Sequence, residues 1–242
     1  MKKLIIALSI IVGVLLILFF VAGYFLGNVP IASKLLGTNK TKNLGVVINM
    51  DNAYAGIKKI NCPLTAQAVK EILANPASYT AVKATLTSDE ASSLMAIGNV
   101  PGLPVRMTQI KFGPNGSFQT SGVINTQELQ DSLKKAGVSG DTIDKVMGYV
   151  EKLKYFNFYA EGTLNITNNK LTGSVTNAKI GNISVPDDLL SKIDSGVADT
   201  VMNKLEQAGY SIRNLTISEG KVNVDMDRPL ADLNHWLKFA QY

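Results

Sequence analysis

The uncharged stretch from Leu4 to Leu26 constrains this chain more than any other feature of its sequence. A bilayer core of roughly 30 Å requires about 20 apolar helical residues, and this stretch meets that requirement. Lys2 and Lys3 precede it, and the positive-inside rule places these lysines in the cytoplasm. The sequence therefore predicts one membrane-spanning helix over residues 4–26, with residues 28–242 on the extracytoplasmic side of the cell membrane.

The alternative for this stretch is a signal peptide that is removed after export. The apolar part of a signal peptide is usually about 7–15 residues long and precedes a cleavage site with small residues. Residues 21–30, with the sequence VAGYFLGNVP, contain no convincing site of this kind. No other stretch approaches about 18 apolar residues, so we expect a single, retained anchor.

Three regions follow from this assignment. Residues 1–27 form the transmembrane anchor with its cytoplasmic lysine pair. Residues 28–43 mix Pro, Gly, Asn, Thr and Lys with little periodicity, as expected of a linker. Turn and cap signals become frequent after this point, so residues 44–242 are expected to form one extracytoplasmic domain.

The charge of the chain limits its partners. The formal net charge is +5, and five lysines close to the anchor contribute to it: Lys34, Lys40, Lys42, Lys58 and Lys59. Such lysines favour anionic lipid headgroups when they lie near the bilayer, but an ordinary solvated linker is the preferred explanation. No dense basic run with interleaved aromatic residues occurs, so nucleic acid is not an expected partner.

Three β-hairpins are predicted, over residues 105–124, 156–180 and 210–226. Their turns contain residues that tolerate a positive φ, at Pro114-Asn115-Gly116, Asn168-Asn169 and Glu219-Gly220. The second hairpin has the clearest pattern, because apolar and small residues alternate with polar ones from Phe156 to Ile166. A strand with one buried and one solvated face requires this alternation.

Helices are predicted between the hairpins. Thr87 and Glu90 match a capping box, and the sequence from Asn125 to Glu128 starts a second helix in a similar way. Shorter helices are expected over residues 65–73, over the apolar stripe of 143–153 and near the C-terminus. The longest helix should occupy residues 186–208, with Pro186 in its first turn. The fold class is therefore α+β, with antiparallel hairpins packed on helices.

Residues for catalysis or metal binding are sparse. His235 is the single histidine, and Cys62 is the single cysteine, so multi-histidine zinc sites and intrachain disulfides are excluded. Acidic pairs occur at Asp89-Glu90 and Asp187-Asp188, where helix starts already explain them. Asp225 and Asp227 lack the spacing and glycine of a calcium loop. We therefore expect no catalytic residue, no metal and no cofactor.

One apolar surface is a candidate ligand site. The long helix and the second and third hairpins each present an apolar face, and together these faces form either a plain helix-on-sheet core or a hydrophobic groove. Gly162 and Gly173 lie within strands and permit curvature there. In the groove hypothesis the ligand contacts Phe156, Phe158, Leu164, Leu171, Val175, Leu190, Ile193, Val197, Val201, Leu205, Val222 and Val224.

The layout resembles a bacterial family of single-pass, extracytoplasmic proteins, the YpmS-like group. The resemblance rests on four features: the lysine-started anchor, the helix start TSDE at residues 87–90, the hairpin from Gln109 to Gly122, and GNISVP at residues 181–186 before a long helix. The last hairpin, residues 214–225, also fits. A more distant similarity to tubular lipid-binding domains implies binding of a lipid or another hydrophobic ligand.

The expected function is non-catalytic binding. A patterned domain on a fixed anchor, without a reactive constellation, suits an accessory or scaffold subunit of a membrane or cell-envelope complex. Its partners would be the bilayer, through residues 4–26, and a membrane protein. The alternative is binding of a lipid or another hydrophobic ligand. An enzyme built on carboxylates such as Asp89, Asp187 or Asp225 is a third hypothesis.

Overall fold

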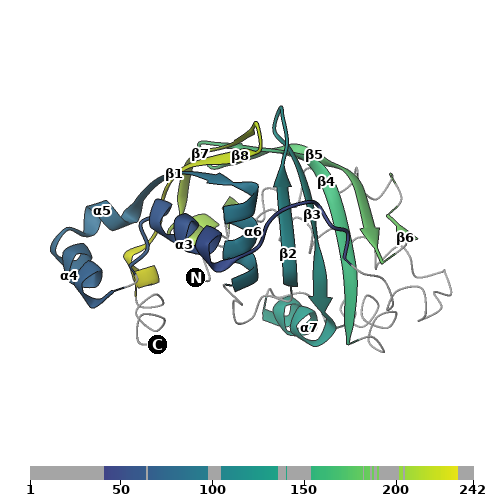
Figure 1. The fold of residues 1–242 in the computed structure, drawn as a ribbon, viewed down its shortest axis with the longest axis horizontal. Helices are drawn as coiled ribbons and strands as arrows, with labels where there is room; N and C mark the ends of the chain where they lie inside the picture. Colours follow the sequence, from purple (N-terminus) through teal and green to yellow (C-terminus); the bar gives the residue numbers. More distant parts are fainter. Residues whose placement is uncertain are drawn as a thin grey trace.

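The computed structural model describes residues 41–63, 65–97, 105–135, 140, 154–181, 183–185, 187, 190, 202–203 and 205–233. Its centre is an antiparallel sheet with the strand order β1-β8-β7-β4-β3-β2, in which β5 pairs with β4, and β6 pairs with β5 (Figure 1). The strands are β1 (Ala81–Thr87), β2 (Val105–Phe112), β3 (Ser117–Asn125), β4 (Tyr155–Thr167), β5 (Lys170–Ile180), β6 (Ile183–Ser184), β7 (Ser211–Ser218) and β8 (Lys221–Asp227).

All three predicted hairpins are confirmed, as β2–β3, β4–β5 and β7–β8. Their turns use the residues that the sequence indicated. Positive φ angles occur at Asn115 and Gly116, at Asn168 and Asn169, and at Glu219 and Gly220. Two consecutive residues with positive φ match the right-handed twist of the flanking strands, which is why such sequences close tight hairpins.

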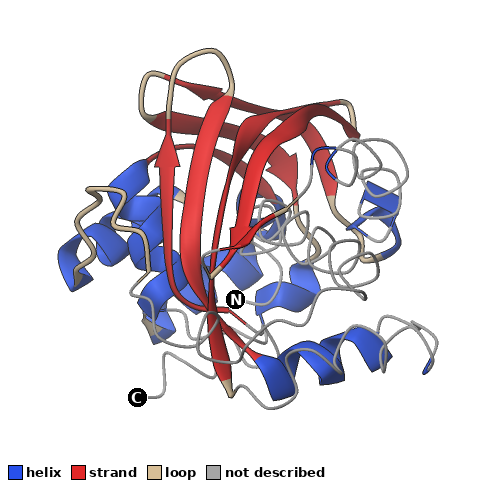
Figure 2. Ribbon diagram, turned by 90° about the vertical axis from the view of Figure 1, so that its right-hand side faces the viewer, coloured by secondary structure: helices blue, strands red, loops and turns tan. Residues whose placement is uncertain are grey.

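The long strand β4 makes the sheet curl. Residues 155–163 pair with β3, whereas Asn165, Ile166 and Thr167 pair with β7 along the same edge. Gly116, at the tip of the β2–β3 hairpin, donates to Ile217 of β7 and accepts from Leu164 of β4 where the partner changes. One strand thus joins two parts of the sheet, and Figure 2 shows the strongly curved result.

Two glycines allow β4 and β5 to approach closely in this curved region. A Cβ atom added to Gly162 would lie 2.0 Å from the carbonyl oxygen of Ser174, and one added to Gly173 would lie 2.1 Å from that of Thr163. The register also shifts beside Gly162, so Thr176 is left as the extra residue of a bulge. Bulges bend a strand and increase its twist, which fits the curl seen here.

Helices pack against the β1 and β2 edges of the sheet and against β3. They are α3 (Met50–Lys59), α4 (Ala66–Ala74), α5 (Pro76–Thr80), α6 (Ser88–Ile97) and α7 (Thr126–Lys135), with a short 3₁₀ turn, η1, at Leu230–Asp232. Helix α6 follows β1 and seals the free edge of β2. Ser92 Oγ donates to the Ile110 carbonyl (3.0 Å) and accepts from the Ile110 amide (2.8 Å). A hydroxyl thus satisfies backbone groups that an open edge would expose.

Three of the predicted helix starts are confirmed, those of α4, α6 and α7. The Glu90 amide donates to Thr87 Oγ1 and the Thr87 amide donates to Glu90 Oε2, which is a complete capping box at α6. Thr65 caps α4, and Asn125 caps α7 by accepting from the Glu128 amide. The sequence analysis did not predict α3 or α5. Helix α3 packs through the small residues Ala53 and Gly56, and α5 is only 5 residues long, so neither buries the row of large apolar residues by which a helix is predicted.

Several predicted segments fall on parts of the chain that the structure does not describe. These are the anchor over 4–26, most of the linker, the stripe of 143–153, most of the long helix over 186–208, and the C-terminal helix. Within the described part of the chain, no helix combines the length and the apolar character that a membrane crossing needs.

Candidate functional site

An extended segment, residues 41–49, crosses the outer face of the sheet, and we call it the strap (Figure 1). The Lys42 carbonyl accepts from Ser121 Oγ of β3 at 2.6 Å. The Leu44 amide then donates to Gln109 Oε1 of β2 at 2.9 Å, and the Val47 amide donates to Asp89 Oδ1 of α6 at 2.9 Å. The strap therefore connects β3, β2 and α6 before the chain enters α3.

The strap begins beside a cluster of polar groups around Glu161, on the middle of β4. Tyr159 donates its hydroxyl proton to Glu161 Oε2, and Gln119 Nε2 donates to the same oxygen at 3.1 Å. Asn177 Nδ2 donates to the other carboxylate oxygen at 3.0 Å. The ammonium of Lys42 lies 3.6 Å from the centre of the Tyr159 ring. Strands β3, β4 and β5 and the strap thus all contribute to one site.

The surroundings shift the protonation of both central groups. The Tyr159 hydrogen bond, followed by that of Asn177, lowers the pKa of Glu161, and the charge of Lys42 acts in the same direction. Burial and the neighbouring carboxylate raise the pKa of Tyr159. At neutral pH the site therefore holds a carboxylate anion and a neutral phenol, because hydrogen bonds to a charged form favour that form.

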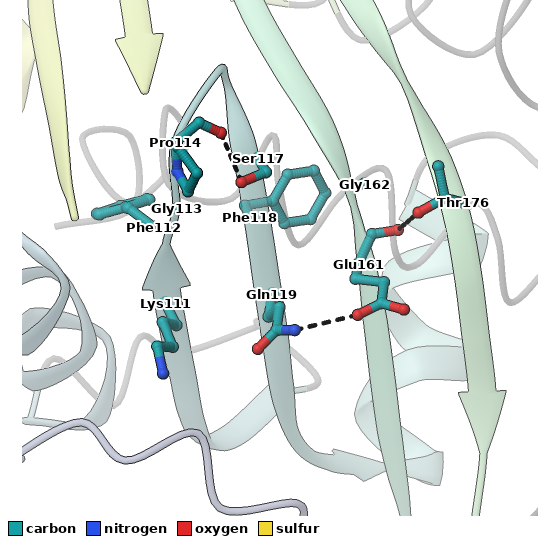
Figure 3. Close-up of a pocket in the computed structure, with 10 residues that line it drawn as sticks. All are labelled: Lys111, Phe112, Gly113, Pro114, Ser117, Phe118, Gln119, Glu161, Gly162 and Thr176. Atoms are coloured by element: carbon teal, nitrogen blue, oxygen red, sulfur yellow. Dashed lines mark hydrogen bonds between the residues drawn. The ribbon is translucent and has the colours of Figure 1, made fainter. Parts of the chain in front are cut away.

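A pocket of about 340 Å³ opens next to this carboxylate (Figure 3). That volume is at the lower end of the range for small-ligand sites, roughly 300–1,000 Å³. The turn above it is fixed by Ser117, whose hydroxyl donates to the Pro114 carbonyl at 2.7 Å. The walls combine charged, amide and aromatic side chains, and consist of Lys111, Phe112, Gly113, Pro114, Ser117, Phe118, Gln119, Glu161, Gly162 and Thr176.

This arrangement is suited to binding rather than to proton transfer. A general acid or base works best when its pKa is close to the working pH, whereas the pKa of Glu161 is lowered from an already acidic value. Its oxygens are oriented by three neutral donors, and Lys111 supplies a positive charge on the pocket wall. The pocket can therefore hold a polar or zwitterionic group by hydrogen bonds and charge.

The residues of the hydrophobic-groove hypothesis lie largely together. One buried cluster contains eight of them: Phe156, Phe158, Leu164, Val175, Leu190, Leu205, Val222 and Val224. Leu171 is partly buried and packs against this cluster. The other three, Ile193, Val197 and Val201, lie outside the described residues. Packing against one another and the sheet accounts for the described members.

Other residues singled out in the sequence have structural partners. Lys59 pairs with Glu90 at 2.7 Å, and Asp89 accepts from the strap. Arg213 pairs with both Asp225 and Asp227. His235 and Asp188 lie outside the described residues, and Asp187 is exposed. The described residues contain no group of three or more metal-binding side chains that could hold an ion.

Cys62 has a neighbour that the sequence did not indicate. The guanidinium of Arg228 lies 3.2 Å from the Cys62 sulfur, and it also donates to the carbonyls of Tyr79 (3.0 Å) and Asn61 (2.9 Å). It stacks on the Tyr79 ring at 3.7 Å from the ring centre. Arg228 is only 2% exposed, so this buried cation ties the loop after α3 and the end of α5 to the end of β8.

The sequence analysis did not identify the Glu161 site. Tyr159 and Glu161 occupy the polar face of a predicted strand, where solvated side chains are usual. Tyr159 is nevertheless 5% exposed, and the strap supplies Lys42 to its ring. A tyrosine and a glutamate two residues apart on one strand face were the available signal, but their neighbours come from distant segments.

Comparison with family models, with curated proteins and with solved structures found no match to this chain.

Proposed function

We propose that this protein is a membrane-anchored extracytoplasmic binding module, an accessory or scaffold subunit of a membrane or cell-envelope complex. Residues 4–26 are its single span, Lys2 and Lys3 remain in the cytoplasm, and the α+β domain lies outside. We also propose that the chain is related to the YpmS-like group of proteins. The fold alone does not fix a function, so the argument depends on the site.

The observation that carries the proposal is the strap. The chain that leaves the anchor is bound to the sheet at Ser121 and Gln109, and its Lys42 lies on the Tyr159 ring. The Glu161 pocket is therefore held next to the tether. A surface in this position is suited to a partner in the same membrane, because the tether keeps both at a high effective concentration.

The polar character of the pocket defines the kind of contact. Glu161 accepts from cationic or hydroxyl groups, and Lys111 and Gln119 donate to acidic or carbonyl groups. An exposed loop of a membrane protein offers such groups. The hydrogen bonds from Tyr159 and Asn177 pre-orient the carboxylate, which reduces the entropy lost on binding.

Photo-crosslinking of the full chain in its native membrane tests this proposal. A photoreactive amino acid replaces Lys111 at the pocket, and a matched variant carries it at Lys170, which is exposed at the start of β5. We expect a discrete adduct with one membrane protein at the first position and none at the second. Equal labelling at both positions, or no adduct at either, contradicts the proposal.

The curl of the sheet favours a second function, binding of a lipid or another hydrophobic ligand. The close approach of β4 and β5 at Gly162 and Gly173 bends the apolar face that carries Leu164 and Val175. Curved sheets of this kind enclose ligands in several folds. Native mass spectrometry of the domain, released by cleavage within residues 28–40, distinguishes the two functions. A stoichiometric lipid-sized adduct supports the second function, and a clean protein mass counts against it.

A further inference from the structure

Exposed apolar side chains gather where the chain enters the domain. Val47 (55% exposed), Ile48 (38%), Met50 (48%) and Tyr54 (50%) lie within eight consecutive positions of the strap and α3. The other large hydrophobic residues exposed in the described part of the chain are scattered, at Leu73, Met107, Tyr155 and Leu230. A cluster of exposed apolar residues on a protein usually marks an interaction site, whereas single exposed apolar residues are ordinary.

The exposed face of α3 changes from apolar to basic along its length. Met50, Tyr54 and Lys58 are spaced four residues apart and therefore lie on one face of the helix. Lys58 and Lys59 occupy the last turn, and Asp51 in the first turn is the acidic residue of the helix. An apolar stripe that ends in lysines is typical of helices that lie in the interface of a membrane, where lysines extend toward the headgroups.

A basic pocket continues the surface beyond the end of α3. Its volume is about 360 Å³, and three ammonium groups line it, those of Lys59, Lys83 and Lys221. Lys59 also pairs with Glu90, and Lys83 lies 3.8 Å from Asp225 with 87% of its side chain exposed. Positive charge therefore remains at the opening, beside the last turn of α3, and it is complementary to a phosphate headgroup.

We infer that α3, the end of the strap and this basic pocket lie on the anionic outer surface of the bilayer that holds the anchor. The inference rests on the anchored arrangement proposed above. The tether of roughly fifteen residues reaches about 50 Å at most when extended, and about 20 Å on average. From Lys42, at the start of the strap, Val47 is only about 17 Å further along an extended chain. We call the end of the strap, α3 and the basic pocket together the patch. A short tether keeps the patch close to the lipids, so that even weak binding to the bilayer surface is sufficient.

Two observations favour a lipid surface over a protein as the partner. The short tether keeps the patch near the bilayer, and its apolar residues are followed by lysines. The apolar residues contact the acyl boundary, the Tyr54 ring lies at the headgroup level, and the lysines meet the phosphates. Docking in this way also fixes which side of the domain faces the membrane. The Glu161 pocket is then held in one orientation relative to proteins in the same bilayer.

Quenching by brominated lipids tests the inference with the full chain. In a Trp236→Phe background, Tyr54→Trp places a fluorophore in the patch, and Leu73→Trp, at a residue 60% exposed on α4, is the control. Both variants are reconstituted into vesicles of phosphatidylcholine with or without phosphatidylglycerol. We expect at least about twofold stronger quenching in the patch than at the control, and only when phosphatidylglycerol is present.

Charge variants sharpen the test. Lys58→Glu and Lys221→Glu should each reduce the quenching at position 54 by about half, whereas Lys170→Glu, exposed on β5, should leave it unchanged. Equal quenching at positions 54 and 73, or quenching that ignores the lipid charge, overturns the inference. Competition by inorganic phosphate beyond that of sodium chloride at equal ionic strength also overturns it, since the pocket then binds a free anion.

The same samples separate this inference from the proposed function. A chain that remains in the vesicles after a carbonate wash is anchored, and the quenching ratio then reports on docking alone. A chain that the wash removes contradicts the anchor. The ratio between the two positions, measured before the wash, still decides whether the patch contacts lipid.

Discussion

Arg228 and Glu161 are both charged groups held by neutral partners, but their surroundings differ. Arg228 is almost fully enclosed, and its described partners are two carbonyls, a sulfur and an aromatic ring. Glu161 accepts from a phenol and two amides, and one side of it faces a pocket. Neutral dipoles can compensate either charge, provided that they are oriented in advance.

The difference indicates two roles. The three side-chain hydrogen bonds of Arg228 reach two other segments, at Asn61–Cys62 and at Tyr79, so its role is to hold those segments to the end of β8. The carboxylate of Glu161 has lone pairs beyond those used by Tyr159, Gln119 and Asn177, and these can meet a ligand. Burial thus distinguishes a structural charge from one available for binding.

The largest effect should come from Arg228→Met. The substitution keeps much of the side-chain volume but removes one hydrogen bond from each of the carbonyls of Asn61 and Tyr79. It also removes the stacking on the Tyr79 ring. We expect the free energy of unfolding to fall by about 4 kcal/mol, since a hydrogen bond to a charged group contributes about 1.5–3 kcal/mol and a desolvated cation–π contact about 2 kcal/mol. Denaturant unfolding of the reconstituted full chain measures this loss.

Arg213→Met is the matched control, because Arg213 also bonds two groups but is 45% exposed. Exposed ion pairs contribute about 0–1 kcal/mol, so this variant should lose less than about 1 kcal/mol. If the two arginine variants lose the same stability, burial does not distinguish their roles and the comparison is wrong.

Gly162→Ala should produce the second largest effect, and it acts on the Glu161 site. The added Cβ would lie 2.0 Å from the Ser174 carbonyl oxygen, and both groups are fixed by the backbone. The strands must separate, which should cost about 2–3 kcal/mol. Gly140→Ala is the control because a Cβ there meets nothing within 4 Å. Thermal unfolding checks both variants, and equal melting temperatures would show that the close approach is unimportant.

The sequence predicted the hairpins because their signals are local. Asn168-Asn169 and Glu219-Gly220 specify tight turns without reference to the rest of the chain. Likewise, the Thr87–Glu90 capping box involves residues three positions apart. Its prediction needed no tertiary information.

The Glu161 site and the Arg228 contacts could not be predicted in this way. Gln119 and Glu161 are 42 positions apart, and Asn61 and Arg228 are 167 apart. The strap was expected to be linker up to residue 43, but Lys42 bonds to Ser121 because polar side chains on the sheet satisfy its backbone. Helix α3 was missed because its stability comes from the Asn49 cap and from packing small residues, Ala53 and Gly56, against α6, and not from burying large apolar side chains.

Glu161→Gln tests the role assigned to Glu161, the less enclosed of the two charged groups compared above. The amide keeps the shape but replaces one acceptor oxygen with a donor, which opposes the donors from Tyr159, Gln119 or Asn177. We expect a loss of about 1 kcal/mol at neutral pH. The folded-state pKa of Glu161 is lowered below 4.5, so its contribution is complete above that pH and disappears as the pH falls through the folded-state pKa.

The difference between the wild-type chain and Glu161→Gln should therefore shrink as the pH falls below 4.5 and through the lowered folded-state pKa, where the native carboxylate also becomes protonated. Unfolding measured between neutral pH and pH 3 provides this difference. Other carboxylates titrate in both chains and cancel. A difference that stays constant with pH would show that the carboxylate is not held in its charged form.

Tyr159→Phe should have the smallest effect at neutral pH and the most informative one in alkali. The ring keeps its place under Lys42, so the loss at neutral pH is that of one hydrogen bond, about 1 kcal/mol or less.

In alkali the sign of the effect changes, because burial raises the folded-state pKa of Tyr159 above its ordinary value of 10.0. Above pH 10 the unfolded chain releases the phenol proton while the folded chain keeps it, so the wild-type chain loses stability as the pH rises. The phenylalanine variant lacks this loss. Its stability relative to the wild-type chain should therefore rise above pH 10, and parallel curves would show that the phenol is not held neutral against the Glu161 carboxylate.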